Sequence, residues 1–252
     1  TASDPATVIY IPAGTYVIKQ TLVLPRCQVT IRGDNNLASV IKSDLGNAAG
    51  TTYVFQVGPF PPYSPPEQVP ACESLRMADL GFQLTNVNGR ALLIYDARSI
   101  TIDRIRVSAI NPTPEASNRT VGLELVTGSP YATAVRINDS LFLGLYLGVY
   151  LHGTVTASSI RGGTFFGPGR GVIQPFPSTA VWICPACTGM SVVSSVFENY
   201  DIGVESRGGS TMIGFNHFEN QGQHHVLLYP PATGTEQSSL VANVFFGTGD
   251  HP

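Results

Sequence analysis

The hydrophobic positions of the chain repeat in one short pattern. Seven times between Met77 and Phe246, an apolar residue is followed, after four intervening residues, by Phe or Val. The seven pairs are Met77/Phe82, Ile102/Val107, Ile137/Phe142, Ile160/Phe165, Val192/Phe197, Ile213/Phe218 and Val241/Phe246. Successive copies lie 21 to 35 residues apart, an interval typical of solenoid coils that carry loops of different lengths.

In each copy, the order of apolar and polar side chains predicts a strand, a tight bend and a second strand. Residues 99–107 alternate apolar and polar side chains, and apolar runs at 148–151 and 202–204 predict a further strand in each coil. The pattern therefore predicts an all-β fold, a single-stranded right-handed parallel β-helix, with coils about 4.8 Å apart. A buried ladder is expected to consist of Phe82, Val107, Phe142, Phe165, Phe197, Phe218 and Phe246.

We expect one β-helix domain over residues 1–252. Four segments rich in Gly, Pro and polar residues interrupt the repeat and are expected to project as loops, at about 58–70, 111–120, 167–179 and 230–237. Such loops either connect coils or carry binding groups. The alternation also turns three apolar residues outward, which predicts an interface in a homo-oligomer. They are Leu143, Leu145 and Phe166.

Composition agrees with short strands joined by turns, because 252 residues include 26 Gly and 19 Pro and only 12% are charged. The net charge of −3, without a basic run, argues against a nucleic-acid partner. No apolar run approaches 18 residues, so membrane insertion is not expected.

Four cysteines are present: Cys27, Cys72, Cys184 and Cys187. The last two form a Cys-Pro-Ala-Cys sequence, which fits a redox or metal pair. No second such sequence and no histidine at ligand spacing accompanies it. A local disulfide, or two reduced thiols in the core, is therefore the favoured interpretation.

The first coils carry a family resemblance. Residues 8–18 (VIYIPAGTYVI) and 29–34 (VTIRGD) resemble the opening of the pectate-lyase-like superfamily, which includes phage tailspike depolymerases, fungal exo-β-1,3-glucanases, and polysaccharide lyases and epimerases. Pro12 ends one strand and Gly14 permits the sharp turn, so these residues mark a fold. Many relatives begin with a capping helix, for which Thr1 to Ala6 leave little room. Either a partner covers this end or a segment has been removed.

Two glutamates are the leading catalytic candidates. Glu198 and Glu219 follow equivalent Phe residues of successive coils and are expected on the surface, with backbones about 4.8 Å apart. Close carboxylates raise each other's proton affinity, and a separation near 5 Å suits a retaining glycosidase. The alternative is a solvated ladder whose side chains splay apart. Asn199 and Asn220, one position later, are expected to form a structural ladder of hydrogen-bonded amides.

Further candidates complete a carbohydrate site. Additional acids are Asp139, Asp201 and Glu205. Positive charges that would neutralise a uronate in a lyase are Arg161, Arg170 and Arg207. Aromatic faces on which sugars stack, if they are not simply packed in the core, are Tyr146, Tyr150, Tyr200 and Trp182.

The histidines give weaker indications. His217 precedes Phe218 and is expected to face outward, where it is a candidate acid or base if it shares a face with Glu219. His224 and His225 are neighbours on a strand and point to opposite faces, which disfavours a shared metal ion. No metal and no other cofactor is expected.

Three function classes follow. The first is an enzyme that cleaves an extracellular or cell-surface polysaccharide, either a glycoside hydrolase or a polysaccharide lyase. The second is a glycan-binding or receptor-binding module of a phage tailspike or fibre, and the third is a purely structural β-helix. The resemblance and the paired carboxylates favour the first, although a fold alone does not decide. The expected location is secreted or on a virion surface, with a trimer if the chain is a spike.

Overall fold

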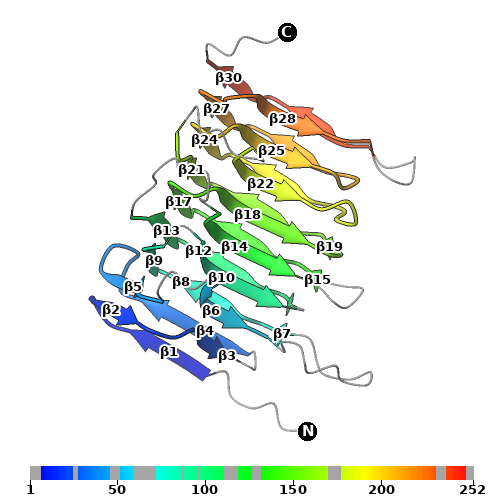
Figure 1. The fold of residues 1–252 in the computed structure, drawn as a ribbon. Coiled ribbons are helices and arrows are strands. Elements are labelled where there is room, and N and C mark those ends of the chain that lie inside the picture. The colour runs from blue at the N-terminus through cyan, green and yellow to red at the C-terminus, as the bar shows by residue number, and fades with distance from the viewer. Residues whose placement is uncertain are drawn as a thin grey trace, which may run out of the picture.

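A computed structural model describes residues 7–24, 28–45, 52–58, 72–86, 88–95, 97–110, 119–126, 132–169, 177–230 and 237–247. The chain winds into a stack of coils in which every strand pairs in parallel with its counterpart in the next coil (Figure 1). Within these residues all regular elements are strands. The predicted parallel β-helix is therefore confirmed.

Four parallel sheets, A to D, run along the axis of the described residues; successive coils pass through sheets A, B and C in that order, and in four of them a strand of sheet D follows. Sheet A contains β1 (Thr7–Ile11), β4 (Val29–Gly33), β8 (Arg76–Ala78), β12 (Thr101–Asp103), β16 (Arg136–Asn138), β20 (Ser159–Arg161), β23 (Ser191–Val193), β26 (Met212–Gly214) and β29 (Ser239–Val241). Sheet B contains β2 (Gly14–Ile18), β5 (Ser39–Ser43), β9 (Gly81–Leu84), β13 (Arg106–Ala109), β17 (Leu141–Leu143), β21 (Thr164–Phe166), β24 (Val196–Glu198), β27 (His217–Glu219) and β30 (Val244–Phe246).

Sheets C and D contain the remaining strands. Sheet C contains β3 (Leu22–Leu24), β6 (Thr52–Val57), β10 (Gly89–Tyr95), β14 (Val121–Val126), β18 (Leu147–His152), β22 (Thr179–Ile183), β25 (Ile202–Ser206) and β28 (His224–Leu228). Sheet D is short and contains β7 (Cys72–Glu73), β11 (Ala97–Arg98), β15 (Ala132–Thr133) and β19 (Val155–Thr156).

A single residue with positive φ makes the bend between sheets A and B. Asp79 (58°), Asp139 (47°), Ser194 (53°) and Phe215 (57°) occupy this position in their coils. One left-handed residue turns the chain sharply, so the two strands are separated by a constant number of residues. This bend is the physical origin of the repeating pattern in the sequence.

The phenylalanine ladder fills the core behind sheet B. The rings of Phe142, Phe165, Phe197 and Phe218 are fully buried, and their centroids are 4.8 to 4.9 Å apart from one coil to the next. Stacked rings at the coil spacing bury a continuous apolar wall. The ladder expected from the sequence is thereby confirmed up to Phe218.

The prediction for the last rung of the ladder is wrong. Phe245, not Phe246, pairs with Phe218, and the two rings stack with centroids 5.3 Å apart. Phe246 pairs with Glu219 and is 54% exposed. The register shifts because Leu240, rather than Val241, aligns with Ile213.

The predicted outward stripe also needs correction. Leu145 is fully buried and belongs to the core. Gly144 precedes it with a φ of 66°, which ends the alternation of β17. Leu143 is half-buried and Phe166 is 41% exposed, so the apolar surface is smaller than expected. The oligomeric state stays a prediction.

A ladder of amides lies at the bend between sheets A and B, earlier in the coil than predicted. Asn216 accepts a hydrogen bond from the Ser195 N–H (2.9 Å) and donates to the carbonyl of Val192 (2.9 Å) and to Oδ1 of Asn243 (3.1 Å). Asn199 and Asn220 instead follow strands of sheet B, with φ values of 59° and 57°. Asn216 and Asn243 thus form an amide ladder at a different bend, and the ladder expected of Asn199 and Asn220 stays a prediction.

Cys184 and Cys187 form a disulfide, which confirms the local-disulfide interpretation. Cys27, the side chain of Cys72 and most of each predicted loop lie outside the described residues. None of the described residues belongs to a helix that is long and apolar enough to cross a membrane.

Candidate functional site

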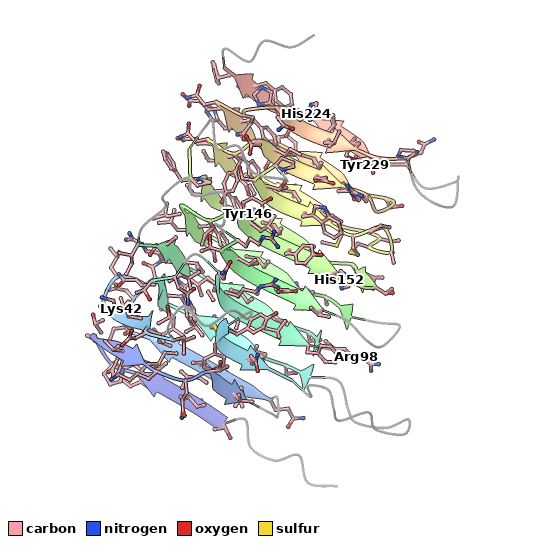
Figure 2. All side chains as sticks on the ribbon, in the orientation of Figure 1. Lys42, Arg98, Tyr146, His152, His224 and Tyr229 are labelled. Atoms are coloured by element: carbon pink, nitrogen blue, oxygen red, sulfur yellow. A yellow bond between two sulfur atoms is a disulfide. The ribbon has the colours of Figure 1, made fainter. Side chains whose placement is uncertain are left out.

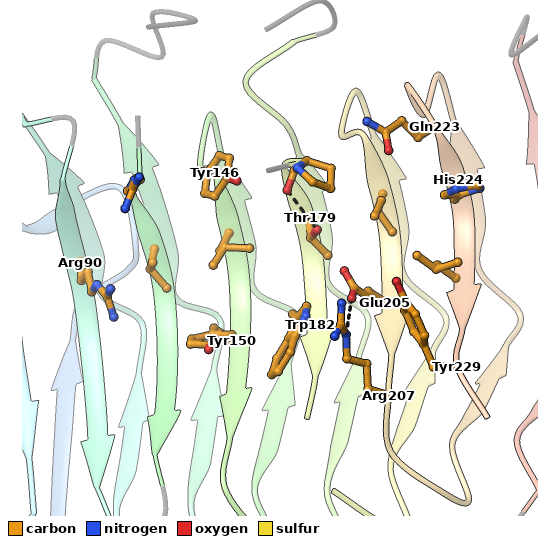
Figure 3. Close-up of a pocket in the computed structure, with 16 residues that line it drawn as sticks. Arg90, Tyr146, Tyr150, Thr179, Trp182, Glu205, Arg207, Gln223, His224 and Tyr229 are labelled. Carbon is orange, nitrogen blue, oxygen red and sulfur yellow. Dashed lines mark hydrogen bonds and ion pairs between the residues drawn. The ribbon is translucent and has the colours of Figure 1, made fainter. Parts of the chain in front are cut away.

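A groove of about 680 Å³ crosses the outer face of sheet C, from β10 to β28 (Figure 3). Parallel pairing aligns Glu124, Tyr150, Trp182 and Glu205 in one row across four successive strands. Side chains at paired positions of neighbouring parallel strands point to the same side of a sheet. The outer face of sheet C therefore carries a row of aromatic and charged groups.

Two aromatic rings occupy the middle of the groove. Tyr150 and Trp182 lie side by side, with centroids 4.9 Å apart and planes tilted by 54° (Figure 3). Both are half-buried, so part of each ring faces the groove. Burial raises the pKa of Tyr150, which keeps its phenol protonated. Tyr146, His224 and Tyr229 lie over the same face (Figure 2).

A cluster centred on Arg207 forms one part of the groove. Nε of Arg207 donates a hydrogen bond to Oε1 of Glu205 at 2.7 Å, and its guanidinium lies 4.5 Å from the ring centroid of Tyr229 and 5.8 Å from that of Trp182. The hydrogen bond to Glu205 raises the pKa of Arg207 further above its usual value. The cation is thus held in one place by three neighbours.

A similar cluster lies three strands away. Arg90 donates to Oε2 of Glu124 and to the Tyr53 hydroxyl (3.2 Å), and that hydroxyl donates to Glu124 at 3.1 Å. The Arg90 guanidinium lies 5.5 Å from the ring centroid of Tyr53. Burial, followed by the charge of Glu124, raises the pKa of Tyr53 to about 12. Each cluster therefore combines a glutamate, an arginine and a tyrosine.

The two glutamates of this row on sheet C do not form a glycosidase pair. Glu124 and Glu205 are three strands apart in the same row, or about 14 Å between backbones. Carboxylate pairs in glycosidases lie roughly 5–9.5 Å apart. Each glutamate is also already bound by an arginine. Their visible role is to fix the two arginines.

The groove brings together part of the predicted site. Tyr146, Tyr150, Glu205 and Arg207 all line it, as does Trp182. Burial raises the pKa of Tyr146 to about 12, so its phenol also stays protonated. Their roles in binding or catalysis stay predictions.

Two predicted residues are part of the framework. Oδ2 of Asp201 accepts hydrogen bonds from the Ser178 N–H (2.8 Å) and hydroxyl (2.9 Å). Tyr200 is fully buried, so the expectation that it presents a face to a sugar is wrong. Burial raises its pKa well above the usual range. Arg170 lies outside the described residues.

The remaining candidates lie away from the groove. Glu198 and Glu219 pair in register on neighbouring strands of sheet B, and Oε2 of Glu219 is 3.2 Å from Nε2 of His217. Asp139 lies at the bend after sheet A, and Arg161 ends β20 of that sheet. The predicted stacking of the two glutamates is correct, and their catalytic role stays a prediction.

Sequence reasoning missed Arg90, Arg119, Gln223 and Tyr229, which also line the groove. The available signal was a charged residue inside an otherwise apolar strand, as with Glu124 in residues 121–126. Among the described residues no three His, Cys, Asp or Glu side chains gather where they would hold a metal ion. His224 lines the groove while His225 contacts the rings of Phe218 and Phe245, as expected for neighbours on a strand.

No family model and no curated protein matches the sequence. Among solved structures, DFA-IIIase from Arthrobacter chlorophenolicus A6 is 13% identical and aligns with a TM-score of 0.67 over 96% of this chain and 67% of that chain. The alginate lyase from Paenibacillus sp. str. FPU-7 is 14% identical, with a TM-score of 0.62 over 98% of this chain and 91% of that chain. At these identities the likeness concerns the fold alone, a parallel β-helix.

Proposed function

We propose that this protein is a polysaccharide-processing enzyme that binds a saccharide chain in the groove on sheet C. The observation that carries the proposal is the Tyr150–Trp182 platform between two arginine clusters. Sugar rings pack their apolar faces on aromatic rings, and arginine donates to hydroxyls and carboxylates in a fixed geometry. The groove crosses six strands, so it is about 24 Å long.

The structural neighbours support this substrate class. Both a DFA-IIIase and an alginate lyase share the fold, and the alginate lyase acts on a polysaccharide. Polysaccharides of this kind occur outside cells, and a disulfide such as Cys184–Cys187 persists most readily in an oxidising compartment. Both points support our proposal that the protein acts outside the cell.

The chemistry of cleavage follows from where the acids lie. Hydrolysis by two carboxylates needs a closely spaced pair. The described strands of sheet C contain no such pair, whereas Glu198 and Glu219 lie in register on neighbouring strands of sheet B. Elimination needs a cation to neutralise a uronate, together with a base and an acid. In the groove, arginines supply the cation, and the phenols of Tyr146 and Tyr150 are protonated donors.

A second function is favoured by a specific observation. Glu205, which lines the groove, and Glu124, in the same row of sheet C, are each held by an arginine, so neither is free to act as an acid or a base. A groove built in this way suits a module that holds a glycan without cutting it. Cleavage assays separate this alternative from the enzyme.

The test uses the only tryptophan of the chain, Trp182, as a reporter of the groove. Purified protein is incubated with a panel of acidic and neutral polysaccharides, and we expect one of them to change the fluorescence of Trp182 and to yield new reducing ends. Absorbance of an unsaturated uronate accompanies these ends in an elimination and is absent in a hydrolysis. Fluorescence change without new ends would replace the enzyme by the binding module.

A matched pair of variants locates the binding. Tyr150→Ala removes half of the platform and is expected to weaken binding about tenfold or more, since stacked aromatic contacts contribute strongly to recognition. Tyr16→Ala removes an exposed tyrosine from the first coil, away from the groove, and is expected to have no effect on binding. Equal affinities for both variants would remove the groove from the proposal.

A further inference from the structure

Five consecutive coils each place one arginine on or beside the outer face of sheet A. These residues are Arg32 in β4, Arg76 in β8, Arg104 directly after β12, Arg136 in β16 and Arg161 in β20. All five are exposed. Because each coil rises about 4.8 Å, this arginine ladder is about 19 Å long and runs parallel to the axis.

Aspartates balance only one end of the arginine ladder. Asp79 binds Arg104 through two hydrogen bonds (2.7 and 3.0 Å) and lies 3.6 Å from Arg32. Asp103 accepts from Arg76 at 3.3 Å. Among the described residues, no ion pair involves Arg136 or Arg161.

Arg136 and Arg161, which form no ion pair with another described residue, lie close together. Arg136 pairs with Ser159, and Asn138 pairs with Arg161, so the arginines occupy diagonal positions on neighbouring strands. The corresponding backbone separation is about 8 Å. Like charges at this spacing repel each other, and a bound anion would remove that cost.

Hydroxyl groups lie in the same row of sheet A. Thr101, Arg136, Ser159 and Ser191 are paired in register on four successive strands. All three hydroxyl-bearing residues are half-buried, so their side chains remain partly accessible. A hydroxyl both donates and accepts, as a sugar hydroxyl does. The face thus combines cations with groups that complement a carbohydrate.

We propose that this face of sheet A is a second binding site, which takes a linear acidic polysaccharide with its chain along the arginine ladder. In every coil that carries an arginine of the ladder, a strand of sheet B lies between sheet A and sheet C along the chain, so the two sites are on different sheets. Carboxylates or sulfates on successive sugars would meet one cation per coil. The proposal does not depend on the function of the groove.

Charge spacing distinguishes this occupant from a nucleic acid. Double-stranded DNA carries one negative charge per roughly 1.7 Å, whereas the ladder presents one arginine per about 4.8 Å. Asp79 and Asp103 further reduce the positive charge of the face. A polymer with about one charge per sugar matches this density better than a duplex does.

The experiment compares two double variants with the same change in net charge. Arg136→Gln with Arg161→Gln removes these two neighbouring arginines. Lys19→Gln with Arg106→Gln removes one cation beside the first coils and one from sheet B. Binding of alginate, a polymer of uronic acids, is measured by biolayer interferometry at low and moderate salt, with neutral dextran as the reference polymer.

We expect the Arg136/Arg161 variant to bind alginate about tenfold more weakly than the parent, and the Lys19/Arg106 variant to stay within about twofold. Added salt should weaken the parent's binding, since the charges are exposed. Arg136→Lys with Arg161→Lys should restore most of the affinity by restoring the charge. An equal loss of alginate affinity in both glutamine variants would refute the proposed site on sheet A. Tighter binding of duplex DNA than of alginate would refute an acidic polysaccharide as its ligand.

The two sites of the protein are told apart by fluorescence. A ligand in the groove changes the emission of Trp182, whereas a polymer on sheet A is expected to bind without that change, because the tryptophan lies on another sheet. A variant that loses alginate binding but keeps the change in Trp182 fluorescence is therefore altered at sheet A. A variant that keeps alginate binding but loses the fluorescence change is altered at the groove.

Discussion

Arg207 and Glu205 form a hydrogen-bonded ion pair on sheet C, with Nε of the arginine 2.7 Å from Oε1 of the glutamate. The guanidinium also lies 4.5 Å from the ring centroid of Tyr229, so the pair is packed as well as charged. Glu205 is almost fully buried, while the arginine keeps part of its surface in the groove. A ligand that binds Arg207 therefore meets a side chain that is already ordered, which lowers the entropic cost of binding.

The first prediction concerns the geometry of this arginine. Arg207→Lys keeps the positive charge but loses the planar group that stacks on Tyr229 and donates to Glu205. We expect saccharide binding to weaken about fivefold to tenfold, measured by Trp182 fluorescence. The same substitution at Arg106, on sheet B, serves as the control and should leave affinity unchanged. A lysine variant with full affinity would show that charge alone is recognised.

The second prediction concerns the phenylalanine ladder. Phe197→Ala leaves a cavity between two stacked rings, and we expect unfolding to become easier by about 3–5 kcal/mol. Phe246→Ala removes an exposed ring of the last coil and should cost less than about 1 kcal/mol. Denaturant melts of the two variants test both the core and the register. A larger loss for Phe246 than for Phe197 would contradict the ladder described here.

The third prediction concerns the buried amide of Asn216. Its side chain accepts from the Ser195 N–H and donates to the Val192 carbonyl, and it is almost fully buried. Asn216→Ala leaves both backbone groups without this partner, so we expect a loss of about 2–3 kcal/mol in the free energy of unfolding. Ser239→Ala, at an exposed position, should change it by less than about 0.5 kcal/mol. Equal melting temperatures would show that water replaces the amide.

The fourth prediction concerns acid stability. Hydrogen bonds from Arg104 hold the pKa of Asp79 below its usual value of 3.8. A lowered folded pKa stabilises the fold above the unfolded pKa, and this stabilisation is lost as pH falls through the folded value. Asp79→Asn should therefore be less stable than the parent at pH 7, with the difference shrinking below about pH 4. Thermal melts at pH 7, 4 and 3 measure it, and a constant difference would assign the effect to packing.

The repeat pattern was enough to predict the fold because, from β8 onward, one left-handed residue at each bend between sheets A and B fixes the spacing between strands. The same pattern misplaced Phe246, since Phe245 and Phe246 are both aromatic and their two registers look alike in sequence. It misplaced Leu145 because alternation ends at Gly144, whose φ of 66° no local pattern announces.

The groove was harder to predict because its clusters form across coils. Arg90 is 37 residues from Tyr53 and 34 residues from Glu124 in the sequence. The segments that connect the three strands differ in length. Only the register of sheet C brings them together, and loops of unequal length hide that register in the sequence. Glu198 and Glu219 stood out because the sheet B strands that carry them contain the most regular repeat.

The last prediction asks which face performs the chemistry. Glu198→Gln and Glu219→Gln each remove one carboxylate of the stacked pair on sheet B, where register places the two residues on neighbouring strands. If a carboxylate pair hydrolyses the substrate, either variant should lower kcat by orders of magnitude with little change in melting temperature, because both side chains are partly exposed. Glu205→Gln is the comparison. This substitution removes the negative charge that holds Arg207 in the groove, so we expect a lower affinity, seen as a higher KM. If cleavage is eliminative, Glu205→Gln should lower activity more than either sheet B variant does. Full activity of both sheet B variants on a cleaved substrate, together with loss in Glu205→Gln, would place the reaction in the groove.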